Sequence, residues 1–141
     1  MMNNSATTVS AELALGLVSP EHGSVPVVAS LFYSADDPYA IRVLFEVGAD
    51  EPVEWIFARD LLAVGMEGPA GQGDVQVWPV DSDGNELLNI ALSSPFGEAH
   101  FEVPRSSTAA FLCRTYEVIA PGRETDYVDV DSELNELLFR A

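Results

Sequence analysis

The residues best suited to nucleophilic or acid–base chemistry are few and scattered. The chain contains two histidines, His22 and His100, and a single cysteine, Cys113. The local patterns put His22 in a loop, His100 within a strand and Cys113 in a helix. A catalytic nucleophile needs a base that a third group orients, and a transition-metal site needs several such ligands together. We therefore predict no catalytic residue, no metal site, no cofactor and no enzymatic activity.

Carboxylates are plentiful, and the chemistry open to them is glycoside hydrolysis by a facing pair. They gather at residues 36–37, at residues 50–51 and between residues 126 and 133. Twenty-three acidic residues in 141 produce such clusters by abundance alone. We interpret them as a solvated acidic face, with a small hydrolase or sugar-binding enzyme as a weaker alternative that would need two converging carboxylates.

Two loops carry partial ligand-binding motifs. The glycine-rich segment 68–73 follows a predicted helix and opens a strand, whereas a dinucleotide-binding loop follows a strand and opens a helix. Residues 81–86 begin like a calcium loop, but the glycine stands fourth instead of sixth and Leu92 occupies the twelfth place. We predict a plain connector for the first segment and a hairpin turn for the second.

The net charge of −17, with six arginines and no lysine, bears on the partners. Proteins that bind nucleic acids gain affinity from cations that replace the counterions of phosphates, and anionic lipid headgroups attract the same cations. We therefore expect no nucleic-acid binding and no direct membrane insertion. The acidity either keeps the protein in solution or recognises a basic patch on a partner.

The start of the chain and the cysteine count bear on the compartment. Residues 1–8 lack a basic region and an apolar stretch, so no signal peptide is visible. A lone cysteine cannot form an internal disulfide. We expect a cytoplasmic protein.

The elements that would position these residues follow from hydrophobic periodicity. Apolar residues at every second position predict strands, and spacing of three and four predicts helices. In the first half we predict strands at 9–17, 25–33, 40–47 and 53–57, then a short helix that ends at 65–68.

The second half repeats this order, with three or four strands and a longer helix. Strands are predicted at 74–78, 87–92 and 99–103, and a helix follows that Ser106 or Ser107 caps and Pro121-Gly122 ends. A last helix is predicted from Asp131. The fold class is therefore α+β, with antiparallel strands in two roughly repeated β-β-β-β-α halves plus a C-terminal helix. We expect residues 1–6 to be a disordered tail and residues 7–141 to form a single domain.

Four residues between positions 53 and 79 are candidates for partner binding. Trp55 and Phe57 share one face of their strand, and Trp78 lies on the next strand. Aromatic residues on strands either fill the core or anchor an interface. Arg59 and Asp60 stand at a predicted strand–helix junction, where Asp60 could cap the helix and Arg59 could pair with an acidic neighbour. Contact of Arg59 with a partner is the alternative.

The same region carries a family resemblance. Its main blocks are Phe-Ala-Arg-Asp-Leu-Leu at 57–62 and Gly-Asp-Val-x-Val-Trp-Pro at 73–79. Further matching residues lie at 37–40, 53–55, 65, 71, 91–95, 97, 111–112, 114–115 and 121–122. In this order and spacing, the chain resembles the SsgA-like proteins of sporulating actinomycetes.

That resemblance implies a non-enzymatic role in sporulation-specific cell division. Members of the family help to place the division protein FtsZ at future septa, together with an SsgA-type paralogue, which implies a location at the septum. Their fold looks like that of the single-stranded nucleic-acid-binding whirly proteins, and they form trimers. Because this chain lacks lysine and a basic strand motif, the nucleic-acid function of that fold is not carried over. A single-stranded nucleic-acid-binding module is the alternative function.

Overall fold

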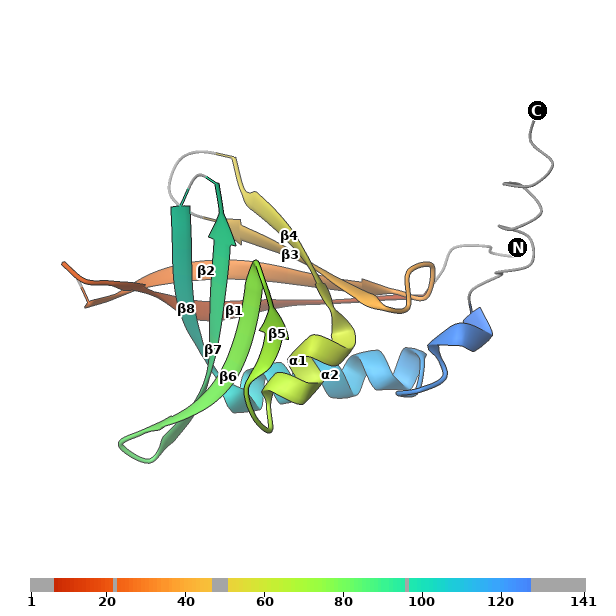
Figure 1. The fold of residues 1–141 in the computed structure, drawn as a ribbon. Coiled ribbons are helices and arrows are strands. Elements are labelled where there is room, and N and C mark those ends of the chain that lie inside the picture. The colour runs from red at the N-terminus through yellow and green to blue at the C-terminus, as the bar shows by residue number, and fades with distance from the viewer. Residues whose placement is uncertain (1–6, 22, 47–50, 96, 128–141) are drawn as a thin grey trace.

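The computed structural model of the chain describes residues 7–21, 23–46, 51–95 and 97–127. Over these residues all strands belong to one antiparallel sheet, in the order β4-β3-β2-β1-β8-β7-β6-β5 (Figure 1). The first half of the chain forms β1 (Thr8–Ser19), β2 (Gly23–Ser34), β3 (Ala40–Glu46), β4 (Val53–Ala58) and helix α1 (Arg59–Gly65). The second half forms β5 (Ala70–Gln72), β6 (Val75–Ser82), β7 (Asn85–Ser94), β8 (Gly97–Pro104), helix α2 (Arg105–Val118) and the short 3-10 helix η1 (Glu124–Tyr127).

The two halves meet at a narrow seam in the middle of the sheet. Strands β1 and β8 pair through Gly16 with Glu102 and through Leu17 with Phe101. Figure 1 shows β7 and β8 running across the direction of β1 and β2. The sheet is therefore strongly curled, and its two outer strands, β4 and β5, are joined through α1, which packs on both of them.

The hydrophobic core lies between the inner faces of the two halves. Alternate residues of each strand point inward, as the period of two predicts. The rings of Phe45 on β3 and Phe101 on β8 stack with their centroids 4.5 Å apart. This contact joins the two halves across the inside of the curl.

Helix α2 closes one end of the core with the apolar stripe that its spacing predicts. Phe111, Leu112 and Thr115 are buried, and so is Ile119 directly after the helix. The predicted cap by Ser106 or Ser107 is wrong. The helix begins at Arg105 with Pro104 in the capping position and without a side-chain cap, because β8 stays paired with β7 up to Pro104 and continues straight into the helix.

Helix α1 is short and sits very close to the sheet. A Cβ atom added to Gly65 would lie 2.4 Å from Cγ1 of Val77, which is fully buried. The glycine is thus what allows this helix to approach β6. The connector predicted at 68–73 contains a three-residue strand, β5, that the sequence did not reveal.

The element order confirms the α+β class, the antiparallel strands and the order of four strands and a helix in each half. The tail at 1–6 and the helix from Asp131 lie outside the described residues. Among the residues that the structure describes, no helix is long and apolar enough to cross a membrane.

Candidate functional site

Arg59 is the most completely enclosed charged residue of the region that carries the family blocks. It is the first residue of α1 and its side chain is 2% exposed. Its backbone N–H donates to the carbonyl oxygen of Tyr39 at 2.7 Å, which fixes the turn from β4 into the helix. A buried cation is tolerated only where its donors and its charge are satisfied.

The guanidinium group donates its hydrogen bonds to acceptors at the end of α2 and just beyond it. Nη1 donates to the carbonyl oxygen of Ile119 at 2.8 Å and to that of Thr115 at 3.3 Å. Nη2 donates to Oε2 of Glu124 at 2.8 Å, and the side chain of Glu124 is 16% exposed. Cations are favoured near the carbonyl end of a helix. We call Arg59, Thr115, Ile119 and Glu124 the arginine clamp.

Two aromatic rings complete the surroundings of this cation. The guanidinium carbon lies 4.8 Å from the ring centroid of Tyr33 and 5.0 Å from that of Tyr116, within the range of cation–π attraction. Burial raises the pKa of the Tyr116 hydroxyl, an effect that Arg59 partly offsets. The hydrogen bond from Arg59 lowers the pKa of the Glu124 carboxyl, so this carboxyl is ionised at neutral pH.

The clamp supports the structural interpretation of Arg59 over direct contact with a partner. Its acidic neighbour is Glu124, 65 positions along the chain, instead of a residue nearby in sequence. The predicted cap by Asp60 is wrong, because Ala58 takes the capping position and no side chain caps the helix. Asp60 lies in the first turn, where its charge suits the helix dipole.

Trp55 and Phe57 share the inner face of β4, as their spacing predicts, with Ile56 exposed on the other face. Their ring centroids are 6.5 Å apart. Phe57 is 2% exposed and belongs to the core, so it offers no surface to a partner. Trp55 is half-buried at the margin of the core.

Trp78 lies on the outer face of the second half, away from Trp55. Its ring centroid is 5.4 Å from that of His100 on β8. Nε2 of His100 lies 2.7 Å from Oδ1 of Asn89 on β7, and Asn89 is buried. Trp78 therefore packs over a small polar cluster and does not join the other three candidates.

The remaining chemical candidates are His22 and Cys113. Cys113 is exposed on α2, whereas His22 lies outside the described residues. The described part of the chain contains no group of three His, Cys, Asp or Glu side chains that could hold a metal ion. The predicted hairpin turn at 81–86 is confirmed, with Asp83 and Gly84 in the left-handed conformation that such turns require.

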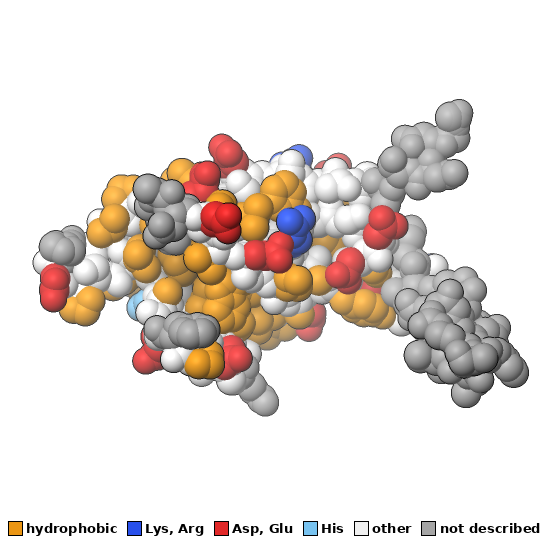
Figure 2. All heavy atoms as spheres, turned by 90° about the horizontal axis from the view of Figure 1, so that it is seen from above, with side chains coloured by type: hydrophobic (Ala, Val, Ile, Leu, Met, Phe, Trp, Pro, Cys, Tyr) orange, Lys and Arg blue, Asp and Glu red, His pale blue; other side chains and the backbone are white. Residues whose placement is uncertain are grey.

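The cationic side chains that the structure describes are all bonded to the protein itself. Besides Arg59, Arg42 pairs with Glu54, Arg105 with Glu67 and Arg123 with Asp126. Arg114 donates to the carbonyl oxygen of Ser10 at 2.9 Å. The surface formed by the described residues therefore presents carboxylates in excess (Figure 2).

The open end of the curled sheet, opposite the helices, carries an apolar hollow. We call it the open-end groove; its volume is about 430 Å³. Figure 2 looks down on this end and shows hydrophobic side chains gathered between the two halves. The groove is lined by Phe45, Val53 and Trp55 from β3 and β4, and by Leu92, Ser94, Gly97, Glu98, Ala99 and Phe101 from β7 and β8.

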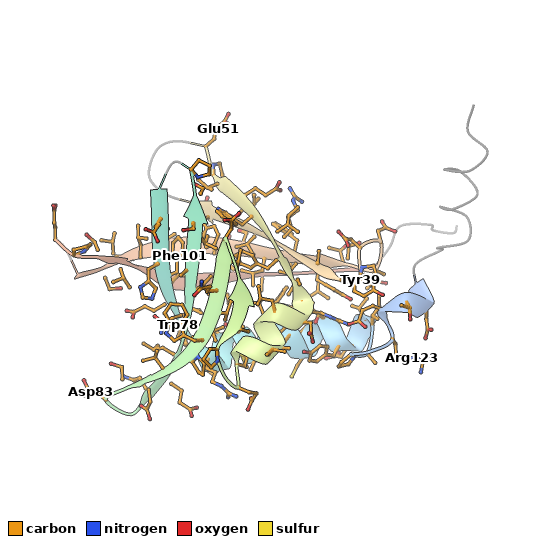
Figure 3. The ribbon with its side chains drawn as sticks, in the orientation of Figure 1. Tyr39, Glu51, Trp78, Asp83, Phe101 and Arg123 are labelled. Carbon is orange, nitrogen blue, oxygen red and sulfur yellow. The ribbon has the colours of Figure 1, made fainter. Side chains whose placement is uncertain are left out.

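Of the four candidates for partner binding, only Trp55 lines the groove. Sequence reasoning missed its other residues, because they come from strands of both halves that meet only when the sheet curls. In Figure 3, Glu51 lies at the open end of the sheet, Phe101 lies deeper in the molecule, and Trp78 and Asp83 lie toward the other end. The exposed valine of the groove wall, Val53 at 44%, is recognisable only in the structure.

Comparison with known proteins decides the family. Residues 27–124 match the model of a family described as Streptomyces sporulation and cell division protein, SsgA. The chain belongs to the SsgA family. Its relatives include the sporulation-specific cell division protein SsgB of Thermobifida fusca, 51% identical over 97% of this chain and 99% of that protein. SsgB of Streptomyces coelicolor is 51% identical over 94% of this chain and 96% of that protein.

Two solved structures of SsgA-family proteins share the fold. The SsgA-like sporulation-specific cell division protein of Thermobifida fusca superposes with a TM-score of 0.85 at 51% identity, covering 96% of this chain and 99% of that one. An SsgB structure described with mutations that correlate to longitudinal cell division during sporulation of Streptomyces coelicolor also gives 0.85, at 49% identity. It covers 90% of this chain and all of that one. The family thus acts in sporulation and cell division.

Proposed function

We propose that this chain is a non-enzymatic regulator of cell division during sporulation that helps to recruit or position FtsZ at sporulation septa. It works through protein–protein contacts, on the cytoplasmic side of the septum and together with an SsgA-type paralogue. The observation that carries the proposal is the match, over nearly its whole length, to relatives named as sporulation-specific cell division proteins.

Two features of the described residues support contact-based action. The arginine clamp uses its buried charges to hold α1 against α2, so these groups act on the protein's own structure. The open-end groove offers an apolar surface large enough to accept a side chain from another molecule.

We further propose that the chain assembles as a homotrimer on a whirly-like topology, which the two similar halves of the sheet support. Sedimentation equilibrium of the purified protein measures the mass of the assembly. A single species of three chains is expected, and a monomer at micromolar concentration would contradict the trimer.

The function is tested with the FtsZ of the same organism. We expect the purified chain to co-sediment with FtsZ polymers, and deletion of its gene to leave aerial filaments without sporulation septa. Absence of both effects would contradict the proposal. Oligonucleotide titrations at low salt test the alternative nucleic-acid role, for which salt-sensitive binding at micromolar concentration or below is the decisive result.

A further inference from the structure

We propose that the open-end groove is a docking site for a partner segment in which an apolar side chain is flanked by lysine or arginine. The inference rests on the proposed function, because it names the surface and the partner chemistry through which the contact would be made. It is argued from the lining, the charge and the position of the groove.

The apolar part of the partner is indicated by the floor of the groove. Phe45 and Phe101 stack there and are 2% and 3% exposed, whereas Val53 on the wall is 44% exposed. Trp55 lies beside Val53 on the same strand and is half-buried. A concave apolar surface with an aromatic floor is where interfaces place their anchoring side chains.

The basic flanks are indicated by the charges at the margin. Glu98 lines the groove, and Glu51, also exposed, stands at the same end of the molecule (Figure 3). None of the described residues that line the groove is basic, and the five arginines that the structure describes are all engaged elsewhere. Complementary charge selects a partner and speeds its approach.

The same charges disfavour a second copy of this chain as the occupant. At this groove the acidic margin of one copy, with Glu98 and Glu51, would meet a surface of the other copy on which carboxylates are in excess, and like charges in contact oppose association there. The proposed trimer would therefore form through another face. A segment with basic residues on both sides of its anchor avoids this repulsion.

The test compares two exposed valines on strands. Val53→Ser changes the groove wall, and Val28→Ser changes a valine of similar exposure, 40%, on β2 outside the groove. The probes are two fluorescein-labelled peptides with a Leu-Phe centre, one flanked by lysines and the other by glutamates. Fluorescence anisotropy measures their binding to the full chain, and thermal unfolding verifies that each variant is folded.

We expect the lysine-flanked peptide to bind and the glutamate-flanked peptide not to bind. Val53→Ser should weaken binding about tenfold, since one apolar anchor contact is lost, and Val28→Ser should leave it unchanged. Glu98→Gln should weaken binding about threefold, as for a solvated charge pair. Equal binding of both peptides, or equal binding by Val53→Ser and the unchanged chain, would overturn the groove assignment.

Three further outcomes test the occupant of the groove and separate this inference from the proposed function. If Val53→Ser lowers the mass of the assembly in sedimentation equilibrium, the occupant is a second copy and the partner assignment is wrong. If the gene restores septation while Val53→Ser changes neither peptide binding nor septation, the groove is wrong and the proposed function stands. If the peptides bind as expected but the gene has no effect on septation, the groove stands and the proposed function is wrong.

Discussion

The arginine clamp and the open-end groove lie at opposite ends of the same curled sheet. They differ in how far their side chains are already covered and bonded by the rest of the protein. In the clamp, a cation that is 2% exposed has a carboxylate, two carbonyl oxygens and two aromatic rings around it. In the groove, the walls formed by the described residues are apolar, with Val53 exposed and Trp55 half-buried.

This difference indicates where stability and recognition reside. Groups whose hydrogen bonds and charge are already satisfied inside the protein gain little from a partner, whereas exposed apolar surface gains free energy when it is covered. Substitutions at the clamp should therefore act on the free energy of unfolding, and substitutions at the groove should act on binding.

The largest effect on stability is expected from Arg59→Leu. The variant removes the cation that pairs with Glu124 and the guanidinium donor to the carbonyl oxygen of Ile119, and loss of one partner of a buried charge pair costs about 3–5 kcal/mol. Urea unfolding monitored by circular dichroism measures it. The control is Arg42→Leu, since Arg42 is 53% exposed in its pair with Glu54 and should change stability by less than about 0.5 kcal/mol. Equal losses of stability in the two variants would contradict a larger contribution of the clamp than of an exposed ion pair.

The next effect tests how tightly α1 is seated beside the clamp. Gly65→Ala places a methyl group against the fully buried Val77, and such overpacking costs about 1–3 kcal/mol. Gly68→Ala is the matched control, because a Cβ there meets nothing within 4 Å. Urea unfolding should give a lower free energy of unfolding for Gly65→Ala than for Gly68→Ala. An unchanged free energy of unfolding in Gly65→Ala would contradict the close packing of α1 on β6.

A smaller, pH-dependent effect is expected from Glu124→Gln. The pKa of Glu124 is lower in the folded protein than its ordinary value of 4.5, so the ionised carboxylate stabilises the fold above that pH. This contribution is lost as the pH falls through the folded pKa. The free energy of unfolding of the variant should be lower than that of the unchanged chain by about 1 kcal/mol at neutral pH. This difference should shrink on acidification. A gap that stays constant with pH would contradict the ion pair.

The smallest expected effect is a shift in tryptophan fluorescence. Trp55 reports on the open-end groove, and Trp78 reports on the outer face of the second half. With selective excitation of tryptophan, Trp78→Phe reports only on Trp55, on the groove wall, and Trp55→Phe reports only on Trp78, over His100. The lysine-flanked peptide should shift the emission of the first variant and leave that of the second unchanged. A shift in the second variant alone would move the docking surface to the outer face of β6 and β8.

Much of the fold could be predicted because alternation of apolar residues is a local signal. The strands at 9–17, 25–33 and 40–47 follow from it and agree closely with β1, β2 and β3 over the described residues. Strand β5 was missed because its three residues are too few to show any period. The serine cap was predicted wrongly because sequence does not show that β8 stays paired up to the first turn of α2.

The site was less predictable, because it depends on contacts between residues far apart in the sequence. Arg59 was recognised as a structural candidate, but its partner Glu124 lies beyond four more strands and a helix. The groove depends on how sharply β8 crosses β1, and that angle follows from packing across the whole sheet. The two main family blocks, at 57–62 and 73–79, indicated the family correctly, whereas none of the described residues that line the groove lies in them.

The position of β1 has a consequence for how the protein is made. Its long second edge pairs with β8 at two positions only, and farther along the strand Arg114 of α2 donates to the carbonyl oxygen of Ser10. Both protecting elements are among the last described parts of the chain to leave the ribosome. While synthesis proceeds, β1 therefore exposes backbone groups that could pair with another nascent chain. Fragments truncated before α2 should aggregate, and translation of the second half sets the time for which this edge stays exposed.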